Sequence, residues 1–453
     1  MPEIKTDLSK QPSMGSSLPT IGKFRPARAW NELTAGETDE AFKKGYGQNY
    51  GLFLTIGGHY WGTSYYRLAP IWFLTFGCWC QLLIIGAVRK ALKTMDMEPM
   101  SENLLFIVMA GNMMLISINY LYYRKFIDDF FTAAGAGFFD YGDTLDSKTR
   151  QKIEKLVTET ARNKERAVSI FGIIVSICSA GMLAKTVGNY FIRYRNIVDV
   201  VDTEISKKQL IAFWFYGIEH WPMYLFCCTS LYSMQLFLMN NIASYVASFI
   251  AFSETIVCEL QIVSLGFREV TARAKHICKL RYGEFEKADT LRYDACLREA
   301  LRASVRHHIV TLEILNGFRA FMSFPLFTVM LTSALMLCMS GYLLTADGIP
   351  LPVKGFSSLM ATAVSIYSFL FCNYGERINE GFNDVGDQLY ADKWMQSSRV
   401  IKPYMAMVKN RCTQPIKLSG GGILEVNLDA FSNVIKTAFS YINFLRTLSN
   451  SSH

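Results

Sequence analysis

The stretch VNLDAFSNVIKTAFSYINFLRTL, residues 426–448, decides the fold class of this chain. It is long enough to cross a bilayer as a helix, because about 20 mostly apolar residues span the hydrocarbon core. Hydroxyl groups and bulky apolar groups mix on one face, whereas the other face is an apolar stripe of Ile435, Phe439, Ile442 and Leu445. A helix with two such faces can pack against protein on one side and line water on the other.

Lys436 lies near the middle of this predicted helix. A charge at the centre of a membrane helix costs on the order of 3 kcal/mol unless the side chain reaches water or a partner. We therefore expect Lys436 to face a water-filled conduit or vestibule. The alternative is that the flexible Lys436 side chain extends (snorkels) and brings its ammonium group to the membrane–water interface.

The composition agrees with a membrane protein. Of the 453 residues, 51% are hydrophobic and 14% aromatic, which is too apolar for an ordinary soluble enzyme of several domains. The sequence contains no metalloprotease, nucleophile-elbow, Walker or dinucleotide-binding motif, so we predict no enzymatic activity, cofactor or metal site. Solvated cytosolic faces and contact with lipid headgroups explain the net charge of +8 without a nucleic-acid partner.

Seven apolar segments predict an all-α membrane protein with seven transmembrane helices. Residues 267–317 and 375–411 are charged but keep helical apolar spacing, which predicts an intracellular helical annex. Gln414-Pro415 and the glycines at 420–422 should break the chain before the last helix. The seven predicted segments are residues 69–88, 103–123, 167–184, 221–253, 321–344, 356–372 and 426–445.

An odd number of crossings places the two termini on opposite sides of the membrane. Lys and Arg are more numerous on the segments that are intracellular when the amino terminus is inside, although those segments are also longer. We therefore expect an intracellular amino terminus. The predicted regions are a cytosolic segment at 1–68, transmembrane helices one to six with intracellular extensions at 69–372, an intracellular helix and Gly-rich turn at 373–425, and a pore-lining helix with an extracellular tail at 426–453.

The carboxy-terminal half, roughly residues 221–448, resembles insect odorant receptors, which are ligand-gated cation channels. The order and spacing of several features carry the resemblance, not a single motif. Arg446-Thr447 near the end favours a ligand-tuned subunit over the shared co-receptor, whose final helix is more apolar and ends near a Gln. The matching features are Phe371-Cys372, Gly375-Glu376, Tyr390, Trp394, Gln414-Pro415, Asp429, Phe431 and residues 440–446.

The resemblance implies four subunits around one pore, either identical or combined with the odorant co-receptor, in the plasma membrane of sensory neurons. The last helix of each subunit would line the pore. Phe444 and Leu448 would form an apolar gate that blocks ions by dewetting, with Thr447 beside it. The predicted pore and gate residues are Lys436, Ser440, Tyr441, Phe444, Thr447 and Leu448.

The resemblance also implies a pocket for a small volatile organic ligand in the outer half of each subunit, among helices two, three, four and six. Met and aromatic side chains supply adaptable apolar contact, and a few hydroxyl groups orient a neutral molecule. Each such residue taken alone is more commonly part of the core. The predicted ligand-binding residues are Met109, Met113, Ser176, Ser179, Phe226, Ser230, Met360, Val364 and Tyr367.

Three other protein classes are the alternatives. A gustatory-type channel is the nearest, but its ending commonly carries a Thr-Tyr and a Gln-Phe that this chain lacks. A G-protein-coupled receptor would have an extracellular amino terminus, and the chain has neither Asp-Arg-Tyr in helix three nor Asn-Pro-x-x-Tyr in helix seven. A transporter or membrane enzyme would call for paired acidic groups or broken helices at the midplane.

Overall fold

The structure is a computed structural model. The predicted cytosolic segment 1–68 and the first predicted crossing 69–88 lie outside the described residues except for single positions. Residues 199–220, which are part of the predicted loop between the third and fourth crossings, also lie outside them. The described residues are 97–198, 221–283, 290–345, 351–391, 400–414 and 416–451, together with Glu40, Cys78 and Ile85.

Helices dominate the described part of the chain, with one short antiparallel strand pair. The elements are α5 (Met97–Tyr122), α6 (Arg124–Ala136), the 3₁₀ turn η2 (Gly142–Thr144), α7 (Ser147–Val198), α9 (Trp221–Arg268), α10 (Val270–Tyr282), α11 (Thr290–Thr345), α12 (Leu351–Ala391), α13 (Ile401–Cys412), β1 (Ser419–Gly420), β2 (Leu424–Glu425) and α14 (Leu428–Ser451).

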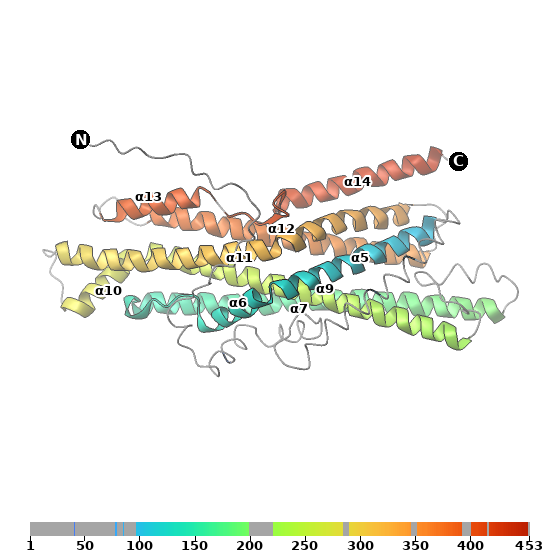
Figure 1. Ribbon diagram of the computed structural model, residues 1–453, viewed down its shortest axis with the longest axis horizontal. Helices are drawn as coiled ribbons and strands as arrows, with labels where there is room; N and C mark the ends of the chain where they lie inside the picture. The colour runs from blue at the N-terminus through green and yellow to red at the C-terminus, as the bar shows by residue number, and fades with distance from the viewer. Residues whose placement is uncertain are drawn as a thin grey trace.

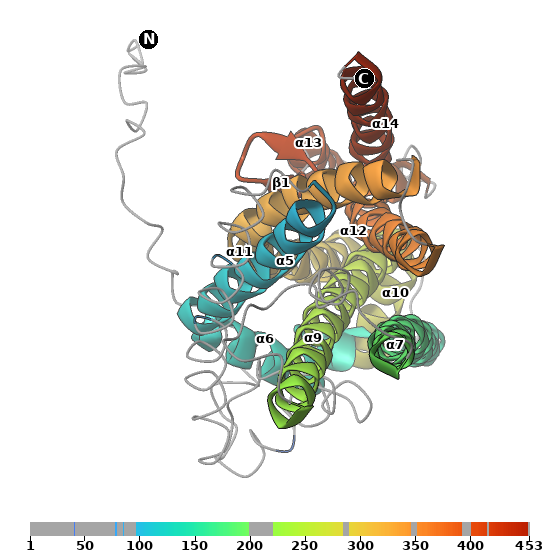
Figure 2. The same cartoon turned by 90° about the vertical axis from the view of Figure 1, so that its right-hand side faces the viewer.

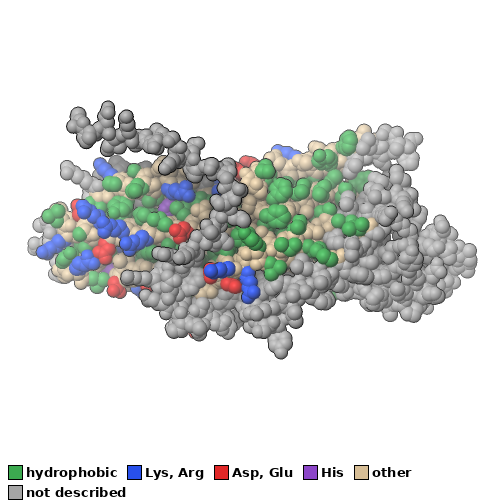
Figure 3. Space-filling view, viewed as in Figure 1, with side chains coloured by type: hydrophobic (Ala, Val, Ile, Leu, Met, Phe, Trp, Pro, Cys, Tyr) green, Lys and Arg blue, Asp and Glu red, His purple; other side chains and the backbone are tan. Residues whose placement is uncertain are grey.

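The helices form an elongated bundle (Figure 1). α7, α9, α11 and α12 run along most of its length, whereas α5 and α14 lie toward one end and α10 and α13 toward the other. Charged side chains gather over the half that holds α10 and α13, whereas hydrophobic side chains predominate over the coloured part of the opposite half (Figure 3). We call these the charged half and the apolar half. A bilayer would surround the apolar half.

Within the described residues, three helices are long and apolar enough to cross a membrane: Leu238–Arg268, Thr290–Thr345 and Lys354–Gln388. A shorter apolar helix covers Ile107–Tyr122. The predicted crossing 167–184 lies within α7, and the predicted crossing 426–445 coincides with α14 from Leu428 onward. The helical character predicted from the sequence is therefore confirmed in this part of the chain.

The predicted intracellular stretches are continuations of the long helices. α11 joins much of the charged stretch to the predicted crossing 321–344 as one helix of 56 residues. Leu297 and Leu301 in the charged part are fully buried, because apolar residues recur there at helical spacing. α12 likewise passes through the predicted boundary at 372–373 and ends only at Ala391.

The predicted break before the last helix takes the form of a tight hairpin. β1 and β2 pair antiparallel, with Ser419 opposite Glu425 and Gly420 opposite Leu424. Gly421 at the turn has a φ of 62°, in the left-handed region that glycine enters without a steric cost. The Gly421 N–H also donates to the Ser323 carbonyl of α11 at 2.9 Å. The hairpin is thereby attached to α11 immediately before α14 begins.

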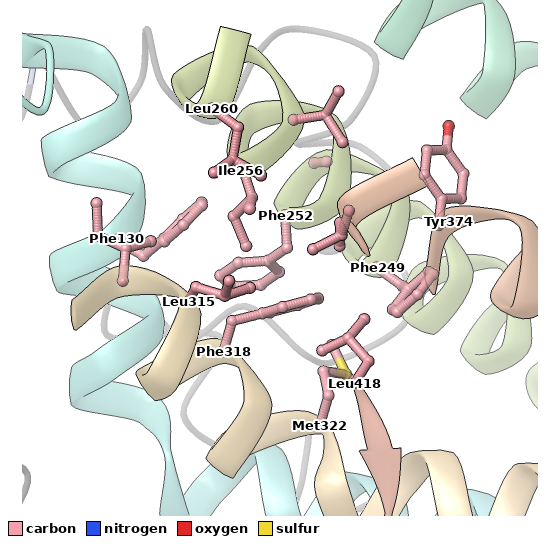
Figure 4. Close-up of a cluster of buried hydrophobic side chains, with 14 of the residues drawn as sticks. Phe130, Phe249, Phe252, Ile256, Leu260, Leu315, Phe318, Met322, Tyr374 and Leu418 are labelled. Carbon is pink, nitrogen blue, oxygen red and sulfur yellow. The ribbon is translucent and has the colours of Figure 1, made fainter. Parts of the chain in front are cut away.

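Aromatic and aliphatic side chains from several helices pack together in the core (Figure 4). The Phe252 ring of α9 lies 4.4 Å from Phe130 of α6 and 5.5 Å from Phe318 of α11, measured between ring centroids. Leu418, just before the hairpin, is buried in the same core. Burying each such side chain stabilises the fold by roughly 1.5–3 kcal/mol. The cluster therefore holds three helices and the hairpin together.

A buried polar network fixes the charged half. The Tyr141 hydroxyl bonds His307 Nδ1 at 2.9 Å, and His307 Nε2 lies 2.8 Å from Glu259. Arg273 donates to Ser304 Oγ at 2.7 Å, and its guanidinium lies over the Tyr141 ring. Burial lowers the pKa of Arg273, but a guanidinium in a protein stays protonated at neutral pH. A permanent buried cation thus joins α10, α11 and the segment before η2.

Candidate ligand cavity and the last helix

A cavity of about 70 Å³ lies in the apolar half, where α5, α7, α9, α11 and α12 converge. Figure 2 looks at this half from its end and shows the five helices grouped together, with α5 and α7 on opposite sides of the group. None of the lining residues is charged, so the cavity suits a neutral molecule. Methionine dominates the wall, with Met109, Met113, Met239, Met336 and Met360.

Five of the nine residues predicted to bind ligand line this cavity: Met109, Met113, Met360, Val364 and Tyr367. They come from α5 and α12, and the sequence placed them at the same predicted depth in the membrane. The Tyr367 ring is held by an edge-to-face contact with Phe371, with 4.9 Å between the ring centroids. The structure therefore brings together the predicted residues of two helices.

The four remaining predicted residues do not add to the described wall. The Ser176 and Ser179 hydroxyls donate to the backbone carbonyls of Gly172 and Val175, four residues earlier in α7. Ser176 is also exposed to solvent or lipid. Phe226 and Ser230 lie in α9, but their side chains are outside the described part of the chain.

The sequence prediction missed the contribution of α11, which supplies Thr332, Ser333 and Met336 to the cavity. It also missed Asn112, which lies three residues after Met109 on the same face of α5. Helical spacing from Met109 could have found Asn112. The rotation of α11, by contrast, cannot be read from its own sequence. The other lining residues that were not predicted are Phe171, Ile174, Val175, Cys178, Met239, Ile242 and Ala363.

A hydrogen bond crosses the wall between α5 and α11. Asn112 Nδ2 donates to Thr332 Oγ1 at 3.1 Å, and the Thr332 hydroxyl donates in turn to the Val329 carbonyl at 3.1 Å. Asn112 is buried, with 6% of its surface exposed. These two hydrogen bonds fix the orientation of the Asn112 amide and of the Thr332 hydroxyl in the cavity wall.

The last helix packs on the other side of this wall. Ala438 of α14 is buried in a cluster with Leu337 of α11 and Val364 of α12. Val364 also lines the cavity, and so does Met336, which packs against the same cluster. Further along, the Ile442 side chain occupies the space that a Cβ at Gly341 would need. The cavity wall and the docking face of α14 thus share side chains.

The opposite face of α14 is exposed and includes the described residues predicted for the pore. Phe439 was expected on the packed stripe but is 64% exposed, so that assignment is wrong. The helix is instead rotated to place small Ala438 against α11 and α12. The Leu448 side chain lies outside the described residues. The exposed predicted pore residues are Lys436, Ser440, Tyr441, Phe444 and Thr447.

Comparison with known proteins decides the family. Residues 96–439 match the family described as 7tm odorant receptor. The chain belongs to this odorant receptor family. Among curated odorant receptors, odorant receptor 94a of Drosophila melanogaster is 29% identical over 120 residues, or 26% of this chain and 31% of the relative. The odorant receptor coreceptor of Ooceraea biroi is 25% identical over 162 residues, or 34% of this chain and 33% of the relative.

These alignments span about a third of the length of the curated odorant receptors. The solved structure of the insect olfactory receptor OR5 from Machilis hrabei in complex with eugenol is similar over 88% of this chain and 96% of that chain, with a TM-score of 0.70. At 13% identity this likeness shows the fold of an odorant receptor. The family match leaves the gustatory, G-protein-coupled and enzyme alternatives without support.

Proposed function

We propose that this chain is a subunit of an odorant-gated cation channel. In this proposal a small, neutral, volatile organic ligand binds in the Met-rich cavity and opens a pore lined by α14. The observation that carries the proposal is the double role of Val364, which lines the cavity and packs against Ala438 of α14. A ligand that displaces Val364 therefore changes the surface on which the last helix rests.

The size of the cavity supports gating by rearrangement. A cavity of about 150 Å³ accommodates benzene, whereas this one measures about 70 Å³. A ligand larger than a few atoms must therefore push the wall outward. Methionine side chains allow this, because three rotatable bonds let them adopt new shapes at low cost. The expanded and contracted walls are two states that a ligand binds with different affinity, which is what gating requires.

The exposed face of α14 supports assembly around a pore. Tyr441 and Phe444 are 57% and 59% exposed in a single copy, and Lys436 lies on the same helix among exposed residues. Such a mixture of cationic, hydroxyl and aromatic groups suits a water-filled conduit better than lipid. We infer four subunits, identical or combined with the co-receptor, with Phe444 and Leu448 as the gate. We place the assembly in the plasma membrane of sensory neurons with an intracellular amino terminus.

The test is ligand-evoked current from the full chain expressed in cells, alone and together with an odorant co-receptor. We expect cation current in at least one of these conditions when a panel of small volatile molecules is applied. Met360→Ala should shift the dose response of an active ligand, because it alters the cavity wall. Phe444→Ala should change the maximal or basal current, because it alters the proposed gate.

Met407→Ala provides the matched control for Phe444→Ala. Met407 is 72% exposed on α13 in the charged half, so its loss should leave both the dose response and the current unchanged. Chains that reach the cell surface but give no current with or without the co-receptor would overturn the proposed function. Equal effects of Phe444→Ala and Met407→Ala on the current would contradict the proposal that α14 lines the pore.

A further inference from the structure

Three buried polar atoms in the residues that line the cavity have no hydrogen-bond partner among the described residues. They are Asn112 Oδ1, Ser333 Oγ and Tyr367 Oη. Ser333 is 1% exposed and Asn112 is 6% exposed. An unpaired polar group away from water costs about 1–3 kcal/mol, so such groups are normally satisfied. All three belong to residues that line one otherwise apolar cavity, and an occupant with polar atoms that reached them would satisfy them.

The hydrogen bonds around Asn112 determine which chemistry is missing. The single proton of the Thr332 hydroxyl is donated to the Val329 carbonyl, so Thr332 Oγ1 can only accept from Asn112. The Asn112 amide must then present its Nδ2 to Thr332, which leaves Oδ1 as the free atom. An amide oxygen accepts and never donates. An occupant that bonds this oxygen must therefore supply a donor.

The other two unpaired atoms, Ser333 Oγ and Tyr367 Oη, can donate a hydrogen bond. The Ser333 and Tyr367 hydroxyls each carry a proton and have no acceptor among the described residues. An occupant with both a donor and an acceptor can therefore bond the Asn112 amide oxygen as well as the two hydroxyls. A neutral hydroxyl group has one donor and two acceptor positions, whereas an aldehyde, ketone or ether accepts only.

We propose that Asn112, Ser333 and Tyr367 make this cavity selective for neutral molecules with a hydroxyl group, that is, small alcohols or phenols. The Met-rich remainder of the wall holds the hydrocarbon part without directional contacts. This inference rests on the proposed function only in assuming that the cavity is the ligand site. It goes further in naming a hydrogen-bond donor as the feature that separates strong ligands from weak ones.

The test is a comparison of probes that differ in one group. Benzyl alcohol donates and accepts, benzaldehyde only accepts, and ethylbenzene does neither, while all three have the same number of non-hydrogen atoms. The linear set 1-hexanol, hexanal and heptane repeats the comparison with another shape. Binding is measured on the purified full-length chain by ligand-induced thermal shift and by calorimetry, and current is recorded separately in cells.

We expect the alcohol of at least one set to bind about tenfold or more tightly than the matching hydrocarbon, with the aldehyde in between. Asn112→Leu, which keeps the volume and removes the acceptor, should reduce the advantage of the alcohol over the aldehyde to less than about threefold. Tyr367→Phe removes one oxygen only and should weaken the alcohol and the aldehyde while leaving the hydrocarbon unchanged. Ser176→Ala is the control, because this hydroxyl lies outside the cavity wall and should change none of the three.

Equal affinity for alcohol, aldehyde and hydrocarbon in both sets would overturn the inference, as would an alcohol preference that both Asn112→Leu and Tyr367→Phe retain. Absence of binding by every probe would overturn it as well. Selective binding without any current would leave this inference standing and refute the proposed channel function. The two failures are therefore distinguishable.

Discussion

Asn119 of α5 donates its Nδ2–H to the backbone carbonyl of Phe321 in α11 at 3.0 Å. This carbonyl lies four residues before Pro325, which has no N–H to offer it. The side chain of one helix thus replaces the hydrogen bond that proline removes from another. Gly421 of the hairpin bonds the Ser323 carbonyl in the same turn. The proline site therefore connects α5, α11 and the segment that leads into α14.

Asn119→Leu should destabilise the protein by about 1–2 kcal/mol, because the Phe321 carbonyl then has no donor. In a Pro325→Ala background the cost should fall, since the alanine supplies the helical N–H that proline lacks. A double-mutant cycle on the purified chain, with unfolding followed against temperature or denaturant, measures this coupling. Additive effects of the two substitutions would show that Asn119 does not compensate for the proline.

Gly375→Ala should destabilise the junction between α12 and the start of α14 by about 1–3 kcal/mol. A Cβ at this position would collide with the Val426 carbonyl oxygen. The control is Gly355→Ala in the same helix, where a Cβ would meet nothing within 4 Å. That change should be neutral or stabilising, because alanine favours the helix. Equal melting temperatures for the two variants would contradict the packing described.

Asn427 caps α14, because its Oδ1 accepts the Ala430 N–H at 2.8 Å. Asn427→Ala should cost about 1 kcal/mol through the loss of this cap. Asn433→Ala in the same helix is the matched control, because Asn433 is exposed and should matter little. Thermal unfolding of both variants distinguishes the cap from a general effect of losing an amide.

Cys412 at the end of α13 should react slowly with alkylating agents. Burial raises the pKa of its thiol to about 11, so less than about one molecule in a thousand carries the thiolate at pH 7.5. Labelling of the folded chain with iodoacetamide, followed by mass spectrometry, should show little modification up to pH 9. Denatured chain is the control and should label readily. Fast labelling of the folded chain would place this thiol in contact with solvent.

The sequence predicted local properties of the candidate site well. Met109, Met113 and Met360 were recognised because their depth along each helix follows from counting residues, and depth is a property of one helix alone. Asn112 was missed although spacing on α5 indicated it. Ser333 could not be predicted, because its position depends on how α11 is rotated against four other helices.

The last helix illustrates the same limit. Its existence and the break before it were predicted from local sequence, whereas the cap at Asn427 was missed because the predicted helix began at residue 426. The face on which it packs does not. The hydrophobic stripe suggested Phe439 as a contact residue, whereas α14 docks through Ala438, whose small side chain lets the helices approach closely. Size complementarity with Leu337 and Val364 outweighed hydrophobicity at this position.

The contact between Gly341 of α11 and Ile442 of α14 gives the last prediction. Gly341→Ala should disturb the docking of α14 and cost about 1–3 kcal/mol, because Ile442 already fills the space beside Gly341. Ile442→Val removes the outermost methyl group and alone should cost about 0.5–1.5 kcal/mol. Combined with Gly341→Ala, however, it should restore part of the lost stability. The sign of this coupling in a double-mutant cycle is the decisive measurement, since two independent defects would simply add. If α14 lines the pore, Gly341→Ala should also alter the basal current of the expressed channel, and Ile442→Val should bring that current back toward its original level.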